Sequence, residues 1–304
     1  MQPLKAPFLI EDAESILKGT RKWGFSYKSL MRKTINILML TVALEFLSFA
    51  GSLHAATLMV PENYKKIQEA VDKAAPGDTI MVSAGSYNEN IVINKPLSIK
   101  SGKGSAYTVI RPLVKKEPVL KISDTANVTV AGFTMTGSDI AGIQLLNARN
   151  VLLSGDMAKQ NVNGIILSHS DNNTLTGNEA YLNSYYGIYL DASSGNKIIK
   201  NTADANNDKG IFLSHSDGNT IQDNVANRNR WNGIMLFSSH GNTVSDNSTI
   251  GNAYGIVTSN SNDNNMISNT TLPNIFIILP IVLIYLGVMS YLLQKTILRL
   301  MHRS

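Results

Sequence analysis

Short apolar runs separated by polar turn residues fill the middle of the chain, between residues 142 and 270. The stretch from Gly210 is representative, because it reads Gly-Ile-Phe-Leu, then Ser-His-Ser-Asp-Gly, then Asn-Thr-Ile-Gln. Apolar pieces of this length between Asn, Gly, Ser and Asp are typical of β-strands joined by turns. Neither the apolar spacing of helical repeats nor the leucine spacing of leucine-rich repeats is present. The pattern therefore predicts many short strands.

The strand pattern recurs at a fixed interval. Seven asparagines lie 23 residues apart, at Asn127, Asn150, Asn173, Asn196, Asn219, Asn242 and Asn265. Gly-Ile pairs spaced by 22 or 23 residues begin at Gly142, Gly164, Gly187, Gly210, Gly233 and Gly255. A fixed period in this range is the signature of a repeat protein, in which each unit packs only on its neighbours. We predict an all-β fold, a parallel β-helix solenoid over residues 57–272.

Alternation within each Gly-Ile-x-Leu segment assigns the side chains to the two faces of a strand. The Ile and Leu are predicted to point inward, at Ile165, Leu167, Ile188, Leu190, Ile211, Leu213, Ile234 and Leu236. The residue between them is predicted to point outward, at Ile166, Tyr189, Phe212, Met235 and Val257. We expect the asparagines to open a turn and to stack inward, with hydrogen bonds from coil to coil. This role is structural and does not indicate a binding site.

Two features precede the repeats. Ile67, Ala70 and Val71 share one face of a short helix predicted within Tyr64–Ala74, and we expect this helix to cap the N-terminal end of the core. Upstream, a basic start at Met31, a mostly apolar stretch and small residues follow the order of a secretory signal. We interpret residues 31–56 as a signal peptide or signal anchor, and residues 1–30 as a leader or a mis-assigned start.

The C-terminal segment is apolar and then basic. Ile275–Leu293 contains no charged residue and has the length needed to span a bilayer. Lys295, Arg299 and Arg303 follow it, as expected on the cytoplasmic side of a membrane span. We predict that residues 273–304 form a transmembrane anchor with a short basic cytoplasmic tail. The repeat domain would then lie outside the cytoplasm, in the periplasm or at the cell surface.

The charge distribution bears on the choice of partners. The chain has 27 Lys and Arg against 22 Asp and Glu, and its pI is 9.2. Residues 57–272 contain 17 basic and 18 acidic side chains, so the repeat domain is near neutral. We therefore expect no nucleic-acid partner. The chain has no cysteine, which excludes disulfides and thiolate metal sites, and we predict no cofactor.

Two groups of motifs resemble a known family. Residues 67–80, with Pro76-Gly77-Asp78, and residues 85–99, with Gly85-Ser86-Tyr87, resemble the opening of pectin-lyase-like right-handed β-helix proteins. The later Gly-Ile-x-Leu and Asn-Thr-Ile coils are similar to NosD-type periplasmic proteins, which are grouped with carbohydrate-binding and sugar-hydrolysis domains. The resemblance covers residues 60–270 and implies a right-handed parallel β-helix. It also implies a choice among polysaccharide lyases, hydrolases, epimerases and an accessory protein for maturation of a copper enzyme.

The motifs of the enzymatic branches of this family are not found. The chain lacks the Asp-Pro-His-Asp of alginate-epimerase-like members, the Gly-Asp-Phe of pectin-esterase-like members and the Asp-Asp pair of polygalacturonase-like members. Gln222-Asp223 matches one pectin-esterase-like motif, but it stands alone and we interpret it as chance. Whether the chain is an enzyme therefore stays open.

Polar corner residues are the candidates for catalysis and metal binding. Asp217 and His240 lie 23 residues apart and are expected in adjacent coils, where a carboxylate could orient an imidazole. His215 lies in the same turn as Asp217. His215, Asp217 and His240 are thus the candidate catalytic residues, and His169, His215 and His240 the candidate metal ligands. The alternative is an ordinary polar solenoid corner, where Asp favours turns.

The apolar residues at outward positions are the candidates for ligand binding. A band of this kind is seldom left bare on a monomer. Aromatic residues also precede the Gly-Ile pairs, at Tyr185, Tyr186, Trp231 and Tyr254. We predict ligand binding by Tyr186, Tyr189, Phe212, Trp231 and Met235, although β-propensity alone could explain the outward residues.

These observations favour a membrane-anchored, extracytoplasmic β-helix that acts as a binding or accessory protein. Polysaccharide is the preferred ligand, and a membrane protein is the other expected partner. One alternative is a polysaccharide lyase, hydrolase or epimerase. Another is a NosD-like accessory protein for copper-enzyme maturation.

Overall fold

The computed structural model describes residues 32, 34–39 and 55–301. The chain divides into two compact units, residues 1–54 and residues 55–304. In the first unit, residues 32 and 34–39 are helical. The predicted leader and most of the predicted signal segment lie outside the described residues.

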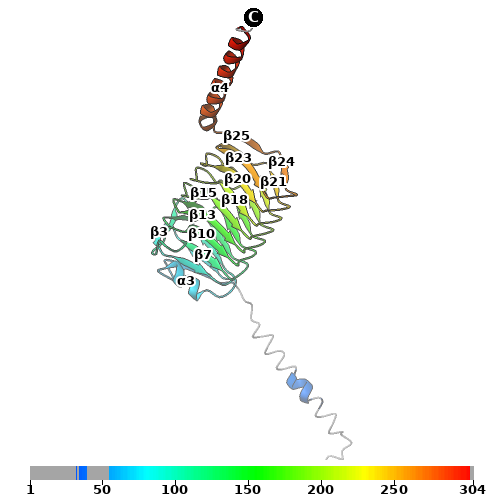
Figure 1. Cartoon of the computed structure of the whole chain (residues 1–304). Coiled ribbons are helices and arrows are strands. Elements are labelled where there is room, and N and C mark those ends of the chain that lie inside the picture. The colour runs from blue at the N-terminus through cyan, green and yellow to red at the C-terminus, as the bar shows by residue number, and fades with distance from the viewer. Residues whose placement is uncertain (1–31, 33, 40–54, 302–304) are drawn as a thin grey trace, which may run out of the picture. The chain divides into compact units, whose positions relative to one another are not determined.

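Parallel strands stack coil upon coil in the second unit (Figure 1). The ten-stranded sheet has the order β1 (Thr57–Val60), β2 (Thr79–Val82), β5 (Ser98–Ser101), β8 (Thr129–Ala131), β11 (Leu152–Ser154), β14 (Thr174–Thr176), β17 (Lys197–Ile199), β19 (Thr220–Gln222), β21 (Thr243–Ser245) and β24 (Asn265–Ile267). The eight-stranded sheet has the order β4 (Ile91–Ile93), β7 (Leu120–Ser123), β10 (Ala141–Leu146), β13 (Asn163–Ser168), β16 (Ile188–Asp191), β18 (Ile211–Ser214), β20 (Asn232–Phe237) and β23 (Tyr254–Ser259).

A third face completes each coil. The five-stranded sheet has the order β3 (Gly85–Asn88), β6 (Thr108–Arg111), β9 (Thr134–Thr136), β12 (Met157–Lys159) and β15 (Glu179–Tyr181). Single bridges through Thr202 and Val225 continue this face to β22 (Ser248–Asn252), which pairs with β25 (Thr270–Pro273). The fold is a right-handed parallel β-solenoid of about nine turns, as predicted from the repeats and the resemblance.

The core is a continuous stack of aliphatic side chains. Ile188 and Leu190 of β16 pair with Ile211 and Leu213 of β18, and all four are fully buried. All eight residues predicted to point inward are fully buried. Because each such side chain contributes about 1.5–3 kcal/mol on burial, this stack is the main source of stability.

The glycine of each Gly-Ile pair reflects the close approach of neighbouring coils. A Cβ added to Gly210 would lie 2.6 Å from Nδ2 of Asn229 and 2.7 Å from the carbonyl oxygen of Gly233. Real Cβ atoms do not approach other atoms so closely, so no side chain fits at the start of β18. The repeated Gly-Ile pair is thus a packing requirement.

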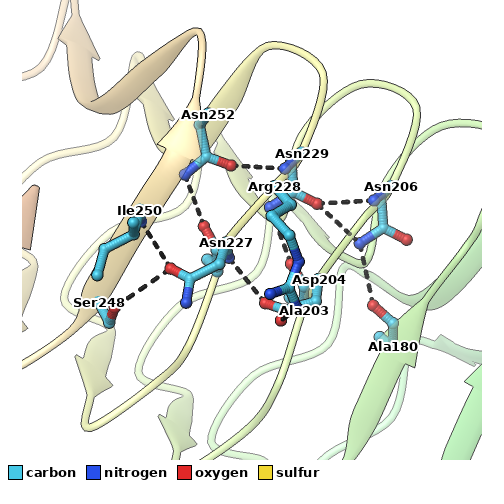
Figure 2. A network of polar contacts seen from close by, with 11 residues as sticks. Ala180, Ala203, Asp204, Asn206, Asn227, Arg228, Asn229, Ser248, Ile250 and Asn252 are labelled. Atoms are coloured by element: carbon cyan, nitrogen blue, oxygen red, sulfur yellow. Dashed lines mark hydrogen bonds and ion pairs between the residues drawn. The ribbon is translucent and has the colours of Figure 1, made fainter. Parts of the chain in front are cut away.

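Ladders of buried polar side chains run along the solenoid, and in the described residues three are of asparagine and one is of serine. In each ladder, the side-chain oxygen accepts a hydrogen bond from the backbone N–H of the coil before it. The first ladder contains Asn173, Asn196, Asn219, Asn242 and Asn264. The second contains Asn178, Asn201, Asn224, Asn247 and Asn269. The third contains Asn161, Asn183, Asn206, Asn229 and Asn252, and Figure 2 shows its last three members. The serine ladder contains Ser170, Ser193, Ser216, Ser239 and Ser261.

The prediction of inward asparagines is confirmed for Asn173, Asn196, Asn219 and Asn242, which are buried. It is wrong for Asn127, Asn150 and Asn265, which are exposed. The reason is that two coils have 22 residues rather than 23. Leu152 pairs with Thr174, and Thr243 pairs with Asn265.

Residues spaced by a constant 23 therefore lie one position away from the ladder at both ends of the series. Val151 occupies the ladder position beside Asn150, and its backbone N–H donates to Oδ1 of Asn173 at 2.9 Å. Asn127 and Asn150 instead have left-handed backbone conformations, with φ of 60° and 52°. Later coils place glycine at the same corner, for example Gly195 and Gly218. Asparagine is one of the few other residues that tolerates this conformation.

The predicted N-terminal helix forms, but its capping role is not confirmed. Helix α3 (Ile67–Lys73) buries Ile67, Ala70 and Val71. It follows β1, the edge strand of the ten-stranded sheet.

The C-terminal segment also forms a helix, α4 (Ile275–Met301). Across the described part of the chain, no helix is sufficiently long and apolar to cross a membrane. The predicted transmembrane anchor at 273–304 is therefore not confirmed.

Candidate functional site

The outer face of the eight-stranded sheet carries a cluster of aromatic rings. Tyr189 of β16 and Phe212 of β18 are register partners, and their rings stack at 5.2 Å between centroids and 9° between planes. Tyr186 lies just before β16, with its ring centroid 5.1 Å from that of Tyr189 and 5.2 Å from that of Phe212. All three side chains are half-buried. The predicted outward direction is correct, but the rings pack on one another.

A lysine lies over this cluster. The Lys209 ammonium is 5.1 Å from the ring centroid of Tyr186 and 5.0 Å from that of Phe212. Its Nζ is 2.9 Å from Oδ1 of Asp208, and only 15% of the lysine side chain is exposed. Cation–π contacts of this kind contribute about 0.5–2 kcal/mol each. The cluster therefore combines apolar surface with a charge that is fixed in position.

The environment of the cluster keeps its phenols neutral. Burial raises the pKa of Tyr189 to about 12, and the Asp191 carboxylate adds to the shift. Burial also raises the pKa of Tyr186, with further contributions from Asp208 and Tyr185. Neither tyrosine can act as a phenolate base at neutral pH.

A second column of aromatic residues lies beside the cluster and is more exposed. Tyr185, Trp231 and Tyr254 are 54%, 49% and 56% exposed. Backbone hydrogen bonds connect these residues from coil to coil. The N–H of Asp208 donates to the carbonyl oxygen of Tyr185, and the N–H of Trp231 donates to that of Asp208. The N–H of Tyr254 donates to the carbonyl oxygen of Trp231. Trp231 and Tyr254 are thus in adjacent coils, and Tyr185 lies two coils before Trp231.

The structure shows which residues lie beside the predicted ligand-binding residues. Tyr186, Tyr189 and Phe212 lie together, and Met235 follows Phe212 in the outward register of β20. Trp231 belongs to the exposed column. Tyr185, Tyr254, Asp208 and Lys209 were not among the predicted ligand-binding residues. Their positions relative to the Gly-Ile pairs, one or two residues before the glycine, are the signal that identifies them.

The candidate catalytic residues lie at the corner that follows the eight-stranded sheet. Asp217 and His240 occupy one column in adjacent coils, as predicted. However, Oδ1 of Asp217 accepts from the backbone N–H of His240 at 2.7 Å, and Nδ1 of His240 accepts from the backbone N–H of Asn262 at 3.0 Å. Within the described residues, the carboxylate makes no hydrogen bond to the imidazole. Both side chains therefore serve the turns of neighbouring coils.

The remaining histidines are separated. His169 and His215 are equivalent corner residues with φ of 49°, and Ala192 lies between them in the column. Nδ1 of His215 is 3.0 Å from Oγ of Ser214. In the described chain, no group of three or more His, Cys, Asp or Glu residues could hold a metal ion.

A polar groove of about 520 Å³ crosses the same corner in earlier coils. Its lining includes Asp124, Arg149, His169, Asp171 and Asn172. The lining has charges of both signs and contains no Phe, Tyr or Trp, so it differs in chemistry from the aromatic columns.

One buried carboxylate lies on the second asparagine ladder. Asp156 is fully buried, and its Oδ1 accepts from the backbone N–H of Phe133 at 2.9 Å. Its backbone N–H donates to Oδ1 of Asn178. Oδ2 has no hydrogen-bond partner. Burial raises the pKa of Asp156 to about 7, partly offset by the hydrogen bond from Phe133.

Comparisons with known proteins agree on the fold. The family described as "Right handed beta helix region" matches residues 119–272. The chain is similar to a "Cell surface glycoprotein" of Methanothermus fervidus, with 30% identity over 136 residues that cover 41% of this chain and 22% of the relative. The chain thus spans about a fifth of the length of that relative.

Two solved structures show the same architecture. One is a double mutant of the periplasmic alginate epimerase AlgG, with a TM-score of 0.52, 16% identity, and coverage of 64% of this chain and 61% of that chain. The other is pectate lyase Pel9A, with a TM-score of 0.51, 13% identity, and coverage of 72% and 78%. At these identities the likeness concerns the fold alone.

Proposed function

Because the chain belongs to the right-handed β-helix family, we propose that it is an extracytoplasmic carbohydrate-binding protein. The proposed contact surface is the exposed aromatic column of Tyr185, Trp231 and Tyr254, together with the adjoining cluster of Tyr186, Tyr189, Phe212, Lys209 and Met235. The ligand class is a polysaccharide chain that runs along the solenoid axis.

The exposed aromatic column is the observation that carries this proposal. Aromatic rings offer a large apolar face with negative charge density, which suits the C–H faces of sugar rings, and the Trp N–H and Tyr O–H can bond to hydroxyls. Neighbouring coils are about 4.8 Å apart, so Trp231 and Tyr254 lie about one such step apart. Tyr185 lies about 10 Å from Trp231 on the same scale. A linear polymer could contact all three rings at once.

The packed cluster plays a supporting part in this arrangement. Tyr189 and Phe212 turn their ring faces to each other, so mainly their edges reach solvent. Lys209 is held over the rings and reaches the same surface as Tyr186. We therefore assign stacking on sugars to the exposed column, and shape and hydrogen bonding to the cluster.

An extracytoplasmic location is supported by two observations. Residues 31–56 have the order of a secretory signal. The similar archaeal protein is named a cell surface glycoprotein. The known activities of the two structural neighbours concern carbohydrate, as their names state, but their low identity limits that support to the fold.

Binding is favoured over catalysis because the candidate catalytic groups are engaged in coil-to-coil hydrogen bonds. Asp217 and His240 each accept from the backbone of the following coil. They also lie at the corner after the strands, whereas the exposed aromatic column lies before them. A sugar held on that column would lie at the opposite end of the strands from these two side chains.

A glycan array with the full chain, followed by calorimetry, tests the proposal. We expect a polysaccharide to bind, and we expect Trp231→Ala to weaken binding about tenfold or more, as is usual for an aromatic contact residue. Tyr107→Ala is the matched control, because Tyr107 is 64% exposed and lies just before β6 of another sheet. Equal affinity of the Trp231→Ala variant and the wild-type chain would contradict the proposed surface, and an array without any bound glycan would contradict the function.

A further inference from the structure

Four asparagines in the chain satisfy the acceptor pattern Asn-x-Ser/Thr, in which x is not proline: Asn127, Asn172, Asn247 and Asn269. In secreted proteins this pattern marks asparagines to which a glycan can be attached, and such sites require an accessible loop. The fold separates the four by accessibility.

Two of the four amides are committed to the second asparagine ladder. Asn247 is buried, and its Nδ2 donates to the carbonyl oxygen of Ile221 at 2.9 Å and to Oδ1 of Asn269 at 3.0 Å. Nδ2 of Asn269 donates to the carbonyl oxygen of Val244 at 2.8 Å. A sugar on either nitrogen would have to lie where the neighbouring coil packs.

The other two asparagines lie at a corner of the solenoid that solvent reaches. Asn127 and Asn172 are exposed, and both have left-handed backbone conformations at the same corner, with φ of 60° and 57°. In the part of the chain that the structure describes, neither Nδ2 donates a hydrogen bond. Oδ1 of Asn127 accepts only a long contact of 3.4 Å from Asn150.

The hydroxyl residues of the two patterns are also equivalent. Thr129 begins β8 and Thr174 begins β14, and both pair with Leu152 of the strand between them. Both threonines are half-buried at outward positions. The two acceptor patterns therefore have one geometry, repeated two coils apart. Asn150 at the intervening corner lacks the pattern, because Leu152 stands at the hydroxyl position.

We propose that Asn127 and Asn172 are N-glycosylation sites, an inference that rests on the extracytoplasmic location proposed above. In the reaction, Nδ2 attacks C1 of a sugar whose C1 is esterified to a lipid-linked phosphate or pyrophosphate. The C1–O bond to the phosphate breaks, the phosphate leaves with the bonding electron pair, and the amide nitrogen loses one proton to base. The donor and the transferase are supplied by the cell.

Glycans at these positions leave the proposed binding surface open. Asn127 and Asn172 follow the carboxyl ends of strands in the eight-stranded sheet, whereas Tyr185 and Trp231 precede the amino ends of such strands. Asn172 also lines the polar groove. A glycan on Asn172 would therefore cover the groove and the His169 corner rather than the aromatic columns.

Peptide mass spectrometry on the full chain from the surface fraction of its own cells tests the proposal. The reference is the same chain made in a cytoplasm without a glycan transferase. We expect peptides with Asn127 and Asn172 to carry added hexose-type masses, and peptides with Asn150 or Asn247 to carry none. Thr129→Ala should remove the added mass from Asn127, Thr174→Ala should remove it from Asn172, and either Thr→Ser variant should keep it.

The outcomes separate this proposal from the proposed function. Unmodified Asn127 and Asn172 in a chain that external protease can digest would overturn the glycosylation alone. Modification of Asn247 instead of Asn127 and Asn172 would overturn the argument that accessibility in the fold selects the modified asparagines. Recovery of the whole chain in the cytoplasm would overturn the proposed location, and the glycosylation with it.

Discussion

Oδ1 of Asn242 accepts two hydrogen bonds from Asn219, one from the backbone N–H at 2.7 Å and one from Nδ2 at 3.1 Å. Nδ2 of Asn219 also donates to the carbonyl oxygen of Ser193 at 3.1 Å. Oδ1 of Asn219 in turn accepts hydrogen bonds from the backbone N–H and from Nδ2 of Asn196. A buried amide is thus satisfied entirely by the coils on either side of it, which is how the solenoid keeps turn backbone inside its core at low cost.

We expect Asn219→Ala to lower the free energy of unfolding by about 1–3 kcal/mol, because it leaves the N–H of Asn196 without its acceptor inside the core. Asn207→Ala is the control, since Asn207 is exposed, and it should cost less than about 0.5 kcal/mol. Denaturation in urea measures both. Equal losses would show that the ladder contributes nothing particular to stability.

Asn227 is not a suitable control for the Asn219 substitution, although its position in the sequence suggests one. It lies outside the predicted set of inward asparagines, but its Oδ1 accepts from the backbone N–H of Ile250 at 2.6 Å and from Oγ of Ser248 at 3.2 Å (Figure 2). Its own N–H donates to Asp204, which also pairs with Arg228 at 2.7 Å. We expect Asn227→Ala to fall between the other two variants.

Close packing of coils predicts the effect of a single methyl group. Gly210→Ala should destabilise by about 1–3 kcal/mol or more, because the new Cβ meets Asn229 and the backbone of Gly233 below 3 Å. Gly102→Ala should be tolerated, since its nearest neighbour would be the carbonyl oxygen of Val82 at 3.6 Å. Thermal unfolding followed by circular dichroism compares the two. A Gly102→Ala variant as unstable as Gly210→Ala would contradict the packing explanation.

The period of the sequence predicts the strands of the solenoid well, but it predicts the positions of the ladders only in part. The Gly-Ile spacing locates the strands and the inward Ile and Leu, because alternation in a strand is fixed by geometry. The asparagine spacing gives wrong positions at Asn127, Asn150 and Asn265. A constant spacing of 23 residues does not follow coils that are one residue shorter. The second and third ladders carry the same 23-residue signal, at Asn178 to Asn247 and at Asn183 to Asn252.

The candidate site was less accessible to sequence reasoning. Alternation correctly points Tyr189 and Phe212 outward, but it carries no information on how Tyr186 and Lys209 fold over them from the preceding turn. Likewise, the spacing of Asp217 and His240 predicts adjacent coils but not that each side chain turns to the backbone of its neighbour. These directions depend on turn geometry, which the period does not specify.

Asp156 makes stability depend on pH. Its pKa of about 7 in the folded state exceeds the ordinary value of 3.8, so folding favours the protonated form. The stabilisation is complete below about pH 4 and is lost as pH rises through about 7, a change on the order of 4 kcal/mol. We expect urea midpoints to fall over this range.

Substitutions at two aspartates isolate this effect. Asp156→Asn should remove the Asp156 contribution to this pH dependence and be the more stable chain above pH 7, because an amide can occupy the ladder without a buried charge. Asp223→Asn, at an exposed position, should leave the dependence unchanged. A pH profile unaffected by Asp156→Asn would assign the dependence to another group.

The two kinds of aromatic residue should separate stability from binding. Phe212→Ala removes the contacts with Tyr186, Tyr189 and Lys209 and should cost about 1–2 kcal/mol. Trp231→Ala should cost less than about 0.5 kcal/mol, because half of that side chain is exposed. Melting temperatures measure both effects, and a Trp231→Ala variant that melts as early as Phe212→Ala would show that the column is structural.

The ladders have a direction. Oδ1 of Asn219 accepts hydrogen bonds from Asn196 in the coil before it, whereas the backbone N–H of Asn219 donates to Oδ1 of Asn242 in the coil after it. During synthesis on a ribosome, each new turn of chain therefore brings the acceptors that the turn made just before it needs. We therefore expect a solenoid that grows from its N-terminus to leave only the ladder N–H groups of its most recent turn without acceptors.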